Sequence, residues 1–437
     1  MDLPGAIADD SGMSGGGSKK SRKLGALGRA LGDAFTGGLV RDLRGARSIA
    51  LRPHKLPAGA DCLLAPDLVC QHVAPDGTVQ ATRGYHLYEL RPGSMRFVRK
   101  CHLPCQFGKA WMGHFSAARR HIHRSDIVDM FALRSGELLV SAGGSLYRGR
   151  PGEGNFQRVF KFRVWGAGMG RGIRSPGLAE LDSGRILFGE YAANQDIGPV
   201  HVYASGDGGG SWELVHDFPD GSIRHVHAIQ QDPFTGAVWI CTGDAGEHSF
   251  IAYSEDEGKT FHRIGGGSQL WRAGKVYFTE DYLYWGADTN LPEDRYIVRW
   301  SRKTGEVERL AEVGGPVLSG TRLAKGTWVL ATDREGTSGL HWFYGPDRCN
   351  TPTEWDEIPS LWVSPSGRRW KRLELTRWLE EAHPWFGVPQ IATGDGAPYL
   401  VFTCLNMERY DSNLIIIREE ELRRWFDVPG PDADPGR

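Results

Sequence analysis

Short apolar runs separated by turn residues fill the chain from about residue 48 onward. Typical runs are ILFGEY, AVWICTG and LVFTCLN, and Gly, Asp, Pro or Ser residues separate such runs. Apolar runs of this length between turn signals predict β-strands rather than helices. The chain contains no stretch of 18 apolar residues, so the pattern predicts no membrane-spanning helix.

Residues 173–261 contain two consecutive copies of one pattern. Each copy has an apolar strand, a turn, a second strand, a polar loop, a third strand and then a signature turn. The signature turns read SGDGGGSW from Ser205 and SEDEGKTF from Ser254, and they start 49 residues apart. The Asp side chain of such a turn can accept backbone N–H groups, and Gly can adopt the positive φ that the turn needs. A four-stranded repeat of about 40–50 residues is typical of a β-propeller blade.

The spacing S-x-D-x-G-x-(S/T)-(W/F) resembles the Asp-box (BNR) repeat of sialidases and related sugar-processing propellers. The resemblance implies an all-β fold, namely a β-propeller of six to seven four-stranded blades, with seven favoured. Seven blade-like units can be counted, the outer ones near 48–105 and 387–425. In that family the Asp-box turn is structural and lies away from the active-site face. The resemblance therefore implies a structural role for Ser205, Asp207, Gly209, Trp212, Ser254, Asp256, Gly258 and Phe261.

The chain divides into an N-terminal arm (1–47), the propeller (48–427) and a loose Pro/Asp/Gly-rich tail (428–437). Residues 1–20 are rich in Gly and Ser and predict disorder. In 19–47, basic residues alternate with Leu and Phe at steps of three or four, which predicts a basic amphipathic helix. Such a helix could contact an anionic membrane surface, or it could pack across the propeller.

Composition narrows the classes of function. A net charge of -1 argues against a general nucleic-acid binder, which is normally basic. The first twenty residues lack an apolar leader, so we expect a cytoplasmic or membrane-peripheral protein. The seven cysteines form no zinc pattern and are expected to be reduced thiols.

The signature turns join the third and fourth strands of a blade, so they mark one face of the propeller. The opposite face is built by the loops after the second strand and by the segments that enter each blade, and ligand sites of propellers usually lie there. Polar and aromatic residues in these segments are the predicted substrate-binding set: Arg171, Arg174, Gln269, Arg272, Trp285, Asp288, Asn290 and Arg334.

Two histidine pairs occur in the segments that enter blades. His121-x-His123 and His225-x-His227 each place two imidazoles on one side of an extended chain, because the strand period is two. Such pairs could bind a divalent metal in the central channel, act as general bases, or do both. The alternative is that one histidine of each pair binds a backbone carbonyl and the other is exposed.

Arg174 lies in Ile173-Arg174-Ser-Pro176, which resembles the Arg-Ile-Pro segment of sialidases. The resemblance implies that Arg174 binds a sugar carboxylate, a task that suits a bidentate guanidinium; the alternative is a salt bridge between blades. The other two arginines of the sialidase triad match no motif, and Arg272 and Arg334 are only candidates. Glu190 and Tyr191 could correspond to the Tyr/Glu pair of that family, although adjacent strand residues point to opposite sides.

Three functions remain open. A glycoside hydrolase acting beside an acidic or decorated sugar would use carboxylates or a phenol from Asp244, Glu190, Asp288 and Tyr191. A lyase acting on a uronate would use a His or Tyr base, with an Arg or a cation neutralising the carboxylate; His225 and His227 are its candidates. A non-catalytic propeller would bind a glycan or a protein. The hydrolase is the first expectation, with a glycan or oligosaccharide as partner.

Overall fold

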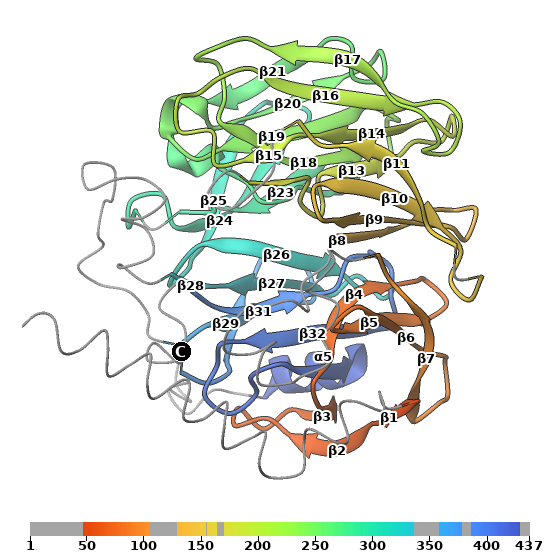
Figure 1. The fold of residues 1–437 in the computed structure, drawn as a ribbon. Helices are drawn as coiled ribbons and strands as arrows, with labels where there is room; N and C mark the ends of the chain where they lie inside the picture. Colours follow the sequence, from red (N-terminus) through yellow and green to blue (C-terminus); the bar gives the residue numbers. More distant parts are fainter. Residues whose placement is uncertain are drawn as a thin grey trace, which may run out of the picture.

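The computed structural model describes residues 47–104, 129–153, 155–163, 170–289, 291–335, 358–377 and 386–428. Seven four-stranded antiparallel blades form a propeller ring (Figure 1). This confirms the predicted all-β propeller and settles the number of blades at seven. Among the described residues, the only α-helix is α5 (Glu419–Asp427).

Strands of the first four blades follow one another along the chain. Blade 1 contains β4 (Val69–Val73), β5 (Val79–Arg83), β6 (His86–Leu90) and β7 (Arg96–His102), with β1 (Ser48–Ala50) on its outer edge. Blade 2 contains β8 (Asp129–Ala132), β9 (Leu138–Ala142), β10 (Ser145–Gly149) and β11 (Gln157–Lys161). Blade 3 contains β13 (Leu178–Glu180), β14 (Ile186–Gly189), β16 (Val200–Ser205) and β17 (Glu213–Phe218). Blade 4 contains β18 (His225–Gln231), β19 (Val238–Gly243), β20 (Phe250–Ser254) and β21 (His262–Gly266).

The last three blades continue the ring. Blade 5 contains β22 (Tyr277–Phe278), β23 (Tyr282–Gly286), β24 (Tyr296–Ser301) and β25 (Val307–Glu312). Blade 6 contains β26 (Val317–Arg322), β27 (Trp328–Thr332), β29 (Ser360–Ser364) and β30 (Lys371–Glu374). Blade 7 contains β31 (Phe386–Ile391), β32 (Tyr399–Leu405), β33 (Asn413–Arg418) and β3 (Asp61–Ala65), flanked by β2 (Arg52–Lys55). The remaining strands are short: β12 (Gly170–Gly172) pairs with β15 (Tyr191–Ala192), and β28 (Arg334–Glu335) pairs with β31.

The second strand of a blade packs between two neighbouring blades, and this explains its continuous apolar sequence. All six residues of β19 and all five of β27 are buried. A strand that is covered on both faces has no polar side, so it loses the alternation of a half-exposed strand. The outer strand β21 has no fully buried residue.

The ring is closed by a strand from the beginning of the described chain. β3 pairs with β33, with Leu63 opposite Ile416 and Ala65 opposite Leu414. The sequence unit 48–105 therefore does not form the first blade alone, because β2 and β3 belong to the last one. The seventh predicted unit extended to residue 425, but its last strand ends at Arg418 and α5 begins at Glu419. The Glu419 carboxylate accepts the backbone N–H groups of Lys325 and Thr327 on blade 6.

Both signature turns have the same hydrogen bonds. Oδ1 of Asp207 accepts the N–H groups of Gly210 and Ser211 at 2.9 Å each, and Oγ of Ser205 accepts the N–H of Gly209 at 2.8 Å. Asp256 and Ser254 repeat this arrangement with Lys259, Thr260 and Gly258. The glycines at the fifth position of the motif, Gly209 and Gly258, both have a φ of 87°. These bonds hold the pKa of both Asp carboxyls far below the usual value, with the backbone N–H of Ser211 and of Thr260 as the main causes.

The closing aromatic residues pack between blades. The Trp212 ring of blade 3 lies 6.3 Å from the ring of Phe160 on β11 of blade 2, and Phe261 of blade 4 stacks on Phe218 on β17 of blade 3 at 6.0 Å between ring centroids. Each turn therefore attaches the outer half of its blade to the neighbouring sheet.

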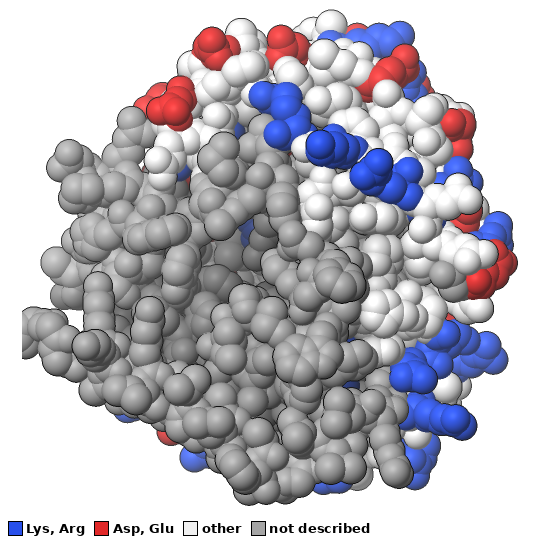
Figure 2. All heavy atoms as spheres, viewed as in Figure 1, with Lys and Arg blue, Asp and Glu red and all other residues white. Residues whose placement is uncertain are grey.

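On the face in Figure 2, Lys and Arg side chains form short rows with Asp and Glu between them. No helix of the described residues is long and apolar enough to cross a membrane. Five of the seven cysteines are described, all as free thiols, and burial raises the pKa of Cys62 and Cys70 to about 12. The predicted basic helix in 19–47 lies almost wholly outside the described residues.

Candidate functional site

A polar residue follows the second strand in five consecutive blades. Each of these residues lies one or two positions after the end of its strand. In chain order they are Glu190 after β14, Asp244 after β19, Asp288 after β23, Asp333 after β27 and Asn406 after β32. Because the second strands all run in the same direction across the ring, these residues lie at one end of it. Four of the five are carboxylates, so the fold concentrates negative charge there, and that charge requires cations or hydrogen bonds close by.

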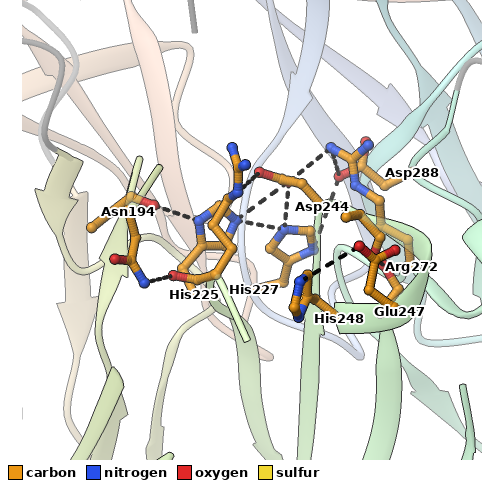
Figure 3. Close-up of polar contacts among 12 residues, drawn as sticks. Asn194, His225, His227, Asp244, Glu247, His248, Arg272 and Asp288 are labelled. Carbon is orange, nitrogen blue, oxygen red and sulfur yellow. Dashed lines mark hydrogen bonds and ion pairs between the residues drawn. The ribbon is translucent and has the colours of Figure 1, made fainter. Parts of the chain in front are cut away.

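His225 and His227 begin β18 and lie side by side (Figure 3). Their Nε2 atoms are 2.9 Å apart. Nδ1 of His225 lies 2.5 Å from the carbonyl oxygen of Ala192, and Nδ1 of His227 lies 3.1 Å from that of Ala273. A carbonyl oxygen only accepts, so each Nδ1 carries a proton and donates it. Both Nε2 lone pairs then face each other, and they repel unless a proton or a metal ion binds them.

Asp244 completes this cluster from the end of β19. Its Oδ1 lies 3.4 Å from Nε2 of His225, 3.5 Å from Nε2 of His227 and 3.0 Å from Nη2 of Arg272. Burial alone would raise the pKa of Asp244, but its contacts with His225 and Arg272 outweigh this effect and hold the pKa well below its usual value. Asp244 is therefore an ionised carboxylate. Burial lowers the pKa of His227, and its contact with Asp244 opposes that shift.

Asp288 lies on the far side of Arg272 and His227. Its Oδ2 is 3.5 Å from Nη2 of Arg272 and 4.0 Å from Nδ1 of His227. Its Oδ1 is buried and has no hydrogen-bond partner in the described part of the chain. Arg272 thus joins two carboxylates from neighbouring blades, and one carboxylate oxygen is left for another group.

Tyr191 and Arg174 cover the histidines and are only half-buried. The Tyr191 ring lies 4.3 Å from the His225 ring, and Cζ of Arg174 lies 5.5 Å from the Tyr191 ring centroid. Burial would lower the pKa of Arg174, but Tyr191, Asp288, Asp333 and Asp129 together raise it. Arg174 makes no ion pair with any described carboxylate, so its guanidinium is available for an anionic ligand.

The structure places the other sequence candidates elsewhere. Glu190 is bound by Nη2 of Arg163 at 2.7 Å and by the N–H of His201 at 3.0 Å, on the opposite side of the strand from Tyr191. Trp285 is fully buried and donates to the carbonyl of Leu270, so it belongs to the core. Gln269 donates to the Asp244 carbonyl at 2.5 Å and supports the loop. Arg171 and Arg334 lie in β12 and β28, while His121, His123 and Asn290 lie outside the described residues.

Sequence reasoning missed Asp129, which begins β8 as His225 begins β18. Its Oδ1 accepts the N–H of Ser175 at 3.3 Å, and its charge acts on Arg174. Alignment of the first strands of successive blades could have found it. The carbonyls of Ala192 and Ala273 leave no signal in a sequence, because every residue has a carbonyl.

No family model matches this chain, and no curated protein matches it. Its structural neighbours include an oligogalacturonate lyase from Vibrio parahaemolyticus, with a TM-score of 0.53 and 10% identity over 84% of this chain and 96% of that one. They also include a GH74 xyloglucanase from Xanthomonas campestris (TM-score 0.49, 14% identity, 82% of this chain and 52% of that one). A GH93 alpha-L-arabinofuranosidase of Fusarium graminearum matches at a TM-score of 0.34 and 14% identity, over 53% and 76% of the two chains. The likeness to the lyase shows the shared propeller fold.

Proposed function

We propose that this propeller is a carbohydrate-active enzyme that cleaves a uronate-containing glycan by β-elimination. One observation carries the proposal: Arg174, a guanidinium without an ion pair to any described carboxylate, lies over the half-buried Tyr191. A guanidinium binds a carboxylate through two parallel hydrogen bonds. A phenol beside that cation is the group best placed to exchange a proton with the bound sugar.

The residues suit each step of an elimination. Arg174 binds the uronate carboxylate, which makes the proton on the adjacent carbon more acidic. The Tyr191 phenolate takes this proton, and the guanidinium stabilises the negative charge that develops on the carboxylate. The electron pair forms the carbon–carbon double bond while the bond to the leaving oxygen breaks. Tyr191 then returns its proton to that oxygen, so the reaction requires no further reactant.

The sequence favoured a glycoside hydrolase, but the contacts of the candidate carboxylates favour the lyase. A hydrolase requires a protonated carboxylic acid beside the scissile bond. Asp244 is held ionised by His225 and Arg272, and Glu190 is bound by Arg163. Hydrolysis stays the second candidate because Asp288 has a buried oxygen with no hydrogen-bond partner in the described residues.

The two signature turns support the finer assignment to Asp-box propellers, which we also propose. The named activity of the oligogalacturonate lyase agrees in class with the proposal. At 10% identity, however, that neighbour contributes the fold and no residue of the site.

Turnover of a panel of uronate oligosaccharides and sialosides tests the proposal. New reducing ends and the ultraviolet absorbance of an unsaturated uronate are followed together. Both signals should rise for a uronate substrate, and Tyr191→Phe, which keeps the ring against His225, should abolish them. The matched control Tyr253→Phe changes a tyrosine of β20 outside the site. Reducing ends without absorbance would establish hydrolysis, and neither signal would leave a glycan- or protein-binding propeller.

A further inference from the structure

We infer that Nε2 of His225, Nε2 of His227 and Oδ1 of Asp244 bind one divalent transition-metal ion of the zinc class. The inference deepens the proposed function, because a cation beside Tyr191 would add positive charge where the uronate carboxylate binds. Its role in the reaction rests on that proposal, but the binding of the ion does not.

The spacing of the three atoms fits one ion. Two ligands about 2.1 Å from a metal and about 90° to 110° apart are separated by about 3.0 to 3.4 Å. The separations here are 2.9 Å between the two nitrogens and 3.4 and 3.5 Å from the nitrogens to Oδ1. In the described part of the chain, this is the one group of three such side chains whose ligand atoms all lie within 4.8 Å of one another.

The hydrogen bonds behind the ligands are those of a metal site. A histidine that binds a metal usually donates its other ring N–H to a carbonyl or a carboxylate, which fixes the ring and its tautomer. Both Nδ1 atoms donate to backbone carbonyls, those of Ala192 and Ala273. In addition, Oδ2 of Asp288 lies 4.0 Å from Nδ1 of His227. Because Nδ1 of each ring carries the donated proton, each Nε2 can offer its lone pair to a metal in place of its present contacts with the other ring and with Asp244.

The surrounding charge tolerates an added cation. Four carboxylates act on this region, those of Asp244, Asp288, Asp333 and Asp129, against the guanidinium groups of Arg174, Arg224 and Arg272. The balance among these groups is negative by one charge, and a divalent ion would change it to positive by one. Two imidazole nitrogens and one carboxylate oxygen are typical ligands of Zn²⁺ and Co²⁺. Such a set leaves coordination positions for water or substrate.

Cobalt titration of the full chain tests the site without any glycan. After removal of metals with a chelator, Co²⁺ should bind at one equivalent, give a visible absorption band, and be displaced by one equivalent of Zn²⁺. His227→Asn should weaken Co²⁺ binding by more than about 100-fold. Asp244→Asn keeps the size of the side chain and gives a second test should the buried histidine be needed for folding. His248→Asn, a neighbouring histidine outside the cluster, should bind as the parent does.

The outcomes separate this inference from the proposed function. Absence of the band in the parent chain, or a band that survives in both His227→Asn and Asp244→Asn, would overturn the metal site. Metal binding without any elimination product would leave the site established and contradict the lyase. An elimination rate that is equal in the metal-free and the zinc-loaded chain would establish the lyase and remove the ion from its reaction.

Discussion

A Cβ atom at Gly243 would lie 2.6 Å from Cε1 of His227 and 3.0 Å from Cγ of Arg272. Gly243 is the last residue of β19, immediately before Asp244. The glycine is therefore needed for space, because it lets the histidine and the arginine pass close to the backbone that positions the carboxylate. Nothing in the hydrophobic pattern of the sequence indicates this role.

Gly243→Ala should displace His227 and disturb the cluster. We expect Co²⁺ affinity to fall at least about 10-fold, because a displaced ligand costs at least as much as a lost supporting contact. The free energy of unfolding should fall by about 1–3 kcal/mol, as in other overpacked sites. Calorimetric titration and urea unfolding measure the two effects. Gly206→Ala is the control, since a Cβ at Gly206 meets nothing within 4 Å; an equal effect of both substitutions would contradict the steric argument.

Glu190→Gln should leave turnover within a few-fold of the parent. Arg163 is 43% exposed and the Glu190 side chain only 5%, but a Gln at this position can still accept from Arg163 and from the N–H of His201, so the substitution should cost about 1–2 kcal/mol of stability. Elimination rates and thermal melts of the variant check both statements. A loss of 100-fold or more in rate with an unchanged melting temperature would show that Glu190 takes part in catalysis.

The signature turns should make the protein sensitive to acid. The pKa of Asp207 and of Asp256 is depressed in the folded chain, mainly by the backbone N–H groups of Ser211 and Thr260. Their contribution to stability is therefore present above the pKa of an unfolded Asp, about 3.9, and is lost as the pH falls below it.

Asp207→Asn should reduce that acid sensitivity, because the amide cannot lose its bonds by protonation. Urea unfolding at pH 7 and pH 3 should show a smaller difference for the variant than for the parent. Asp220→Asn, on an exposed loop, serves as control. A parent stability that does not change between the two pH values would contradict the assignment.

Sequence patterns predicted the blades well because each blade repeats the same local physics. Buried second strands such as β19 and β27 and the two signature turns are local features. The pairing of β3 with β33 cannot be predicted from local patterns, because the two strands lie near opposite ends of the chain. The predicted seventh unit, 387–425, also did not anticipate α5, in which a polar segment directly after the LIII run of β33 forms a helix from Glu419.

The candidate site was predicted in part. His225-x-His227, Asp244, Arg272 and Arg174 were found because their polar character conflicts with a core strand. The partners that decide their chemistry could not be found, since Ala192 and Ala273 act through backbone carbonyls. The partner of Glu190 is Arg163, at the end of the preceding blade, and no spacing rule connects these two residues.

Ala65→Asp should open the ring. Ala65 is fully buried in β3 opposite Leu414, so the substitution would place an unpaired charge in the closing sheet. We expect a loss of more than about 3 kcal/mol, the cost of an uncompensated buried charge. Ala324→Asp makes the same change at an exposed position of blade 6 and should cost less than about 0.5 kcal/mol. Urea unfolding compares them, and equal losses would show that β3 does not hold the ring.

The pairing of β3 with β33 also determines when the protein can complete its folding. During synthesis β3 emerges early and must wait for β33, which is made only after nearly all of the other blades. Until then the growing chain exposes unpaired strand edges on both sides, the kind of surface that invites wrong pairing between chains. Translation that stops before Asn413 would therefore yield an open arc with two exposed edges, a form that chaperones would have to protect or proteases remove.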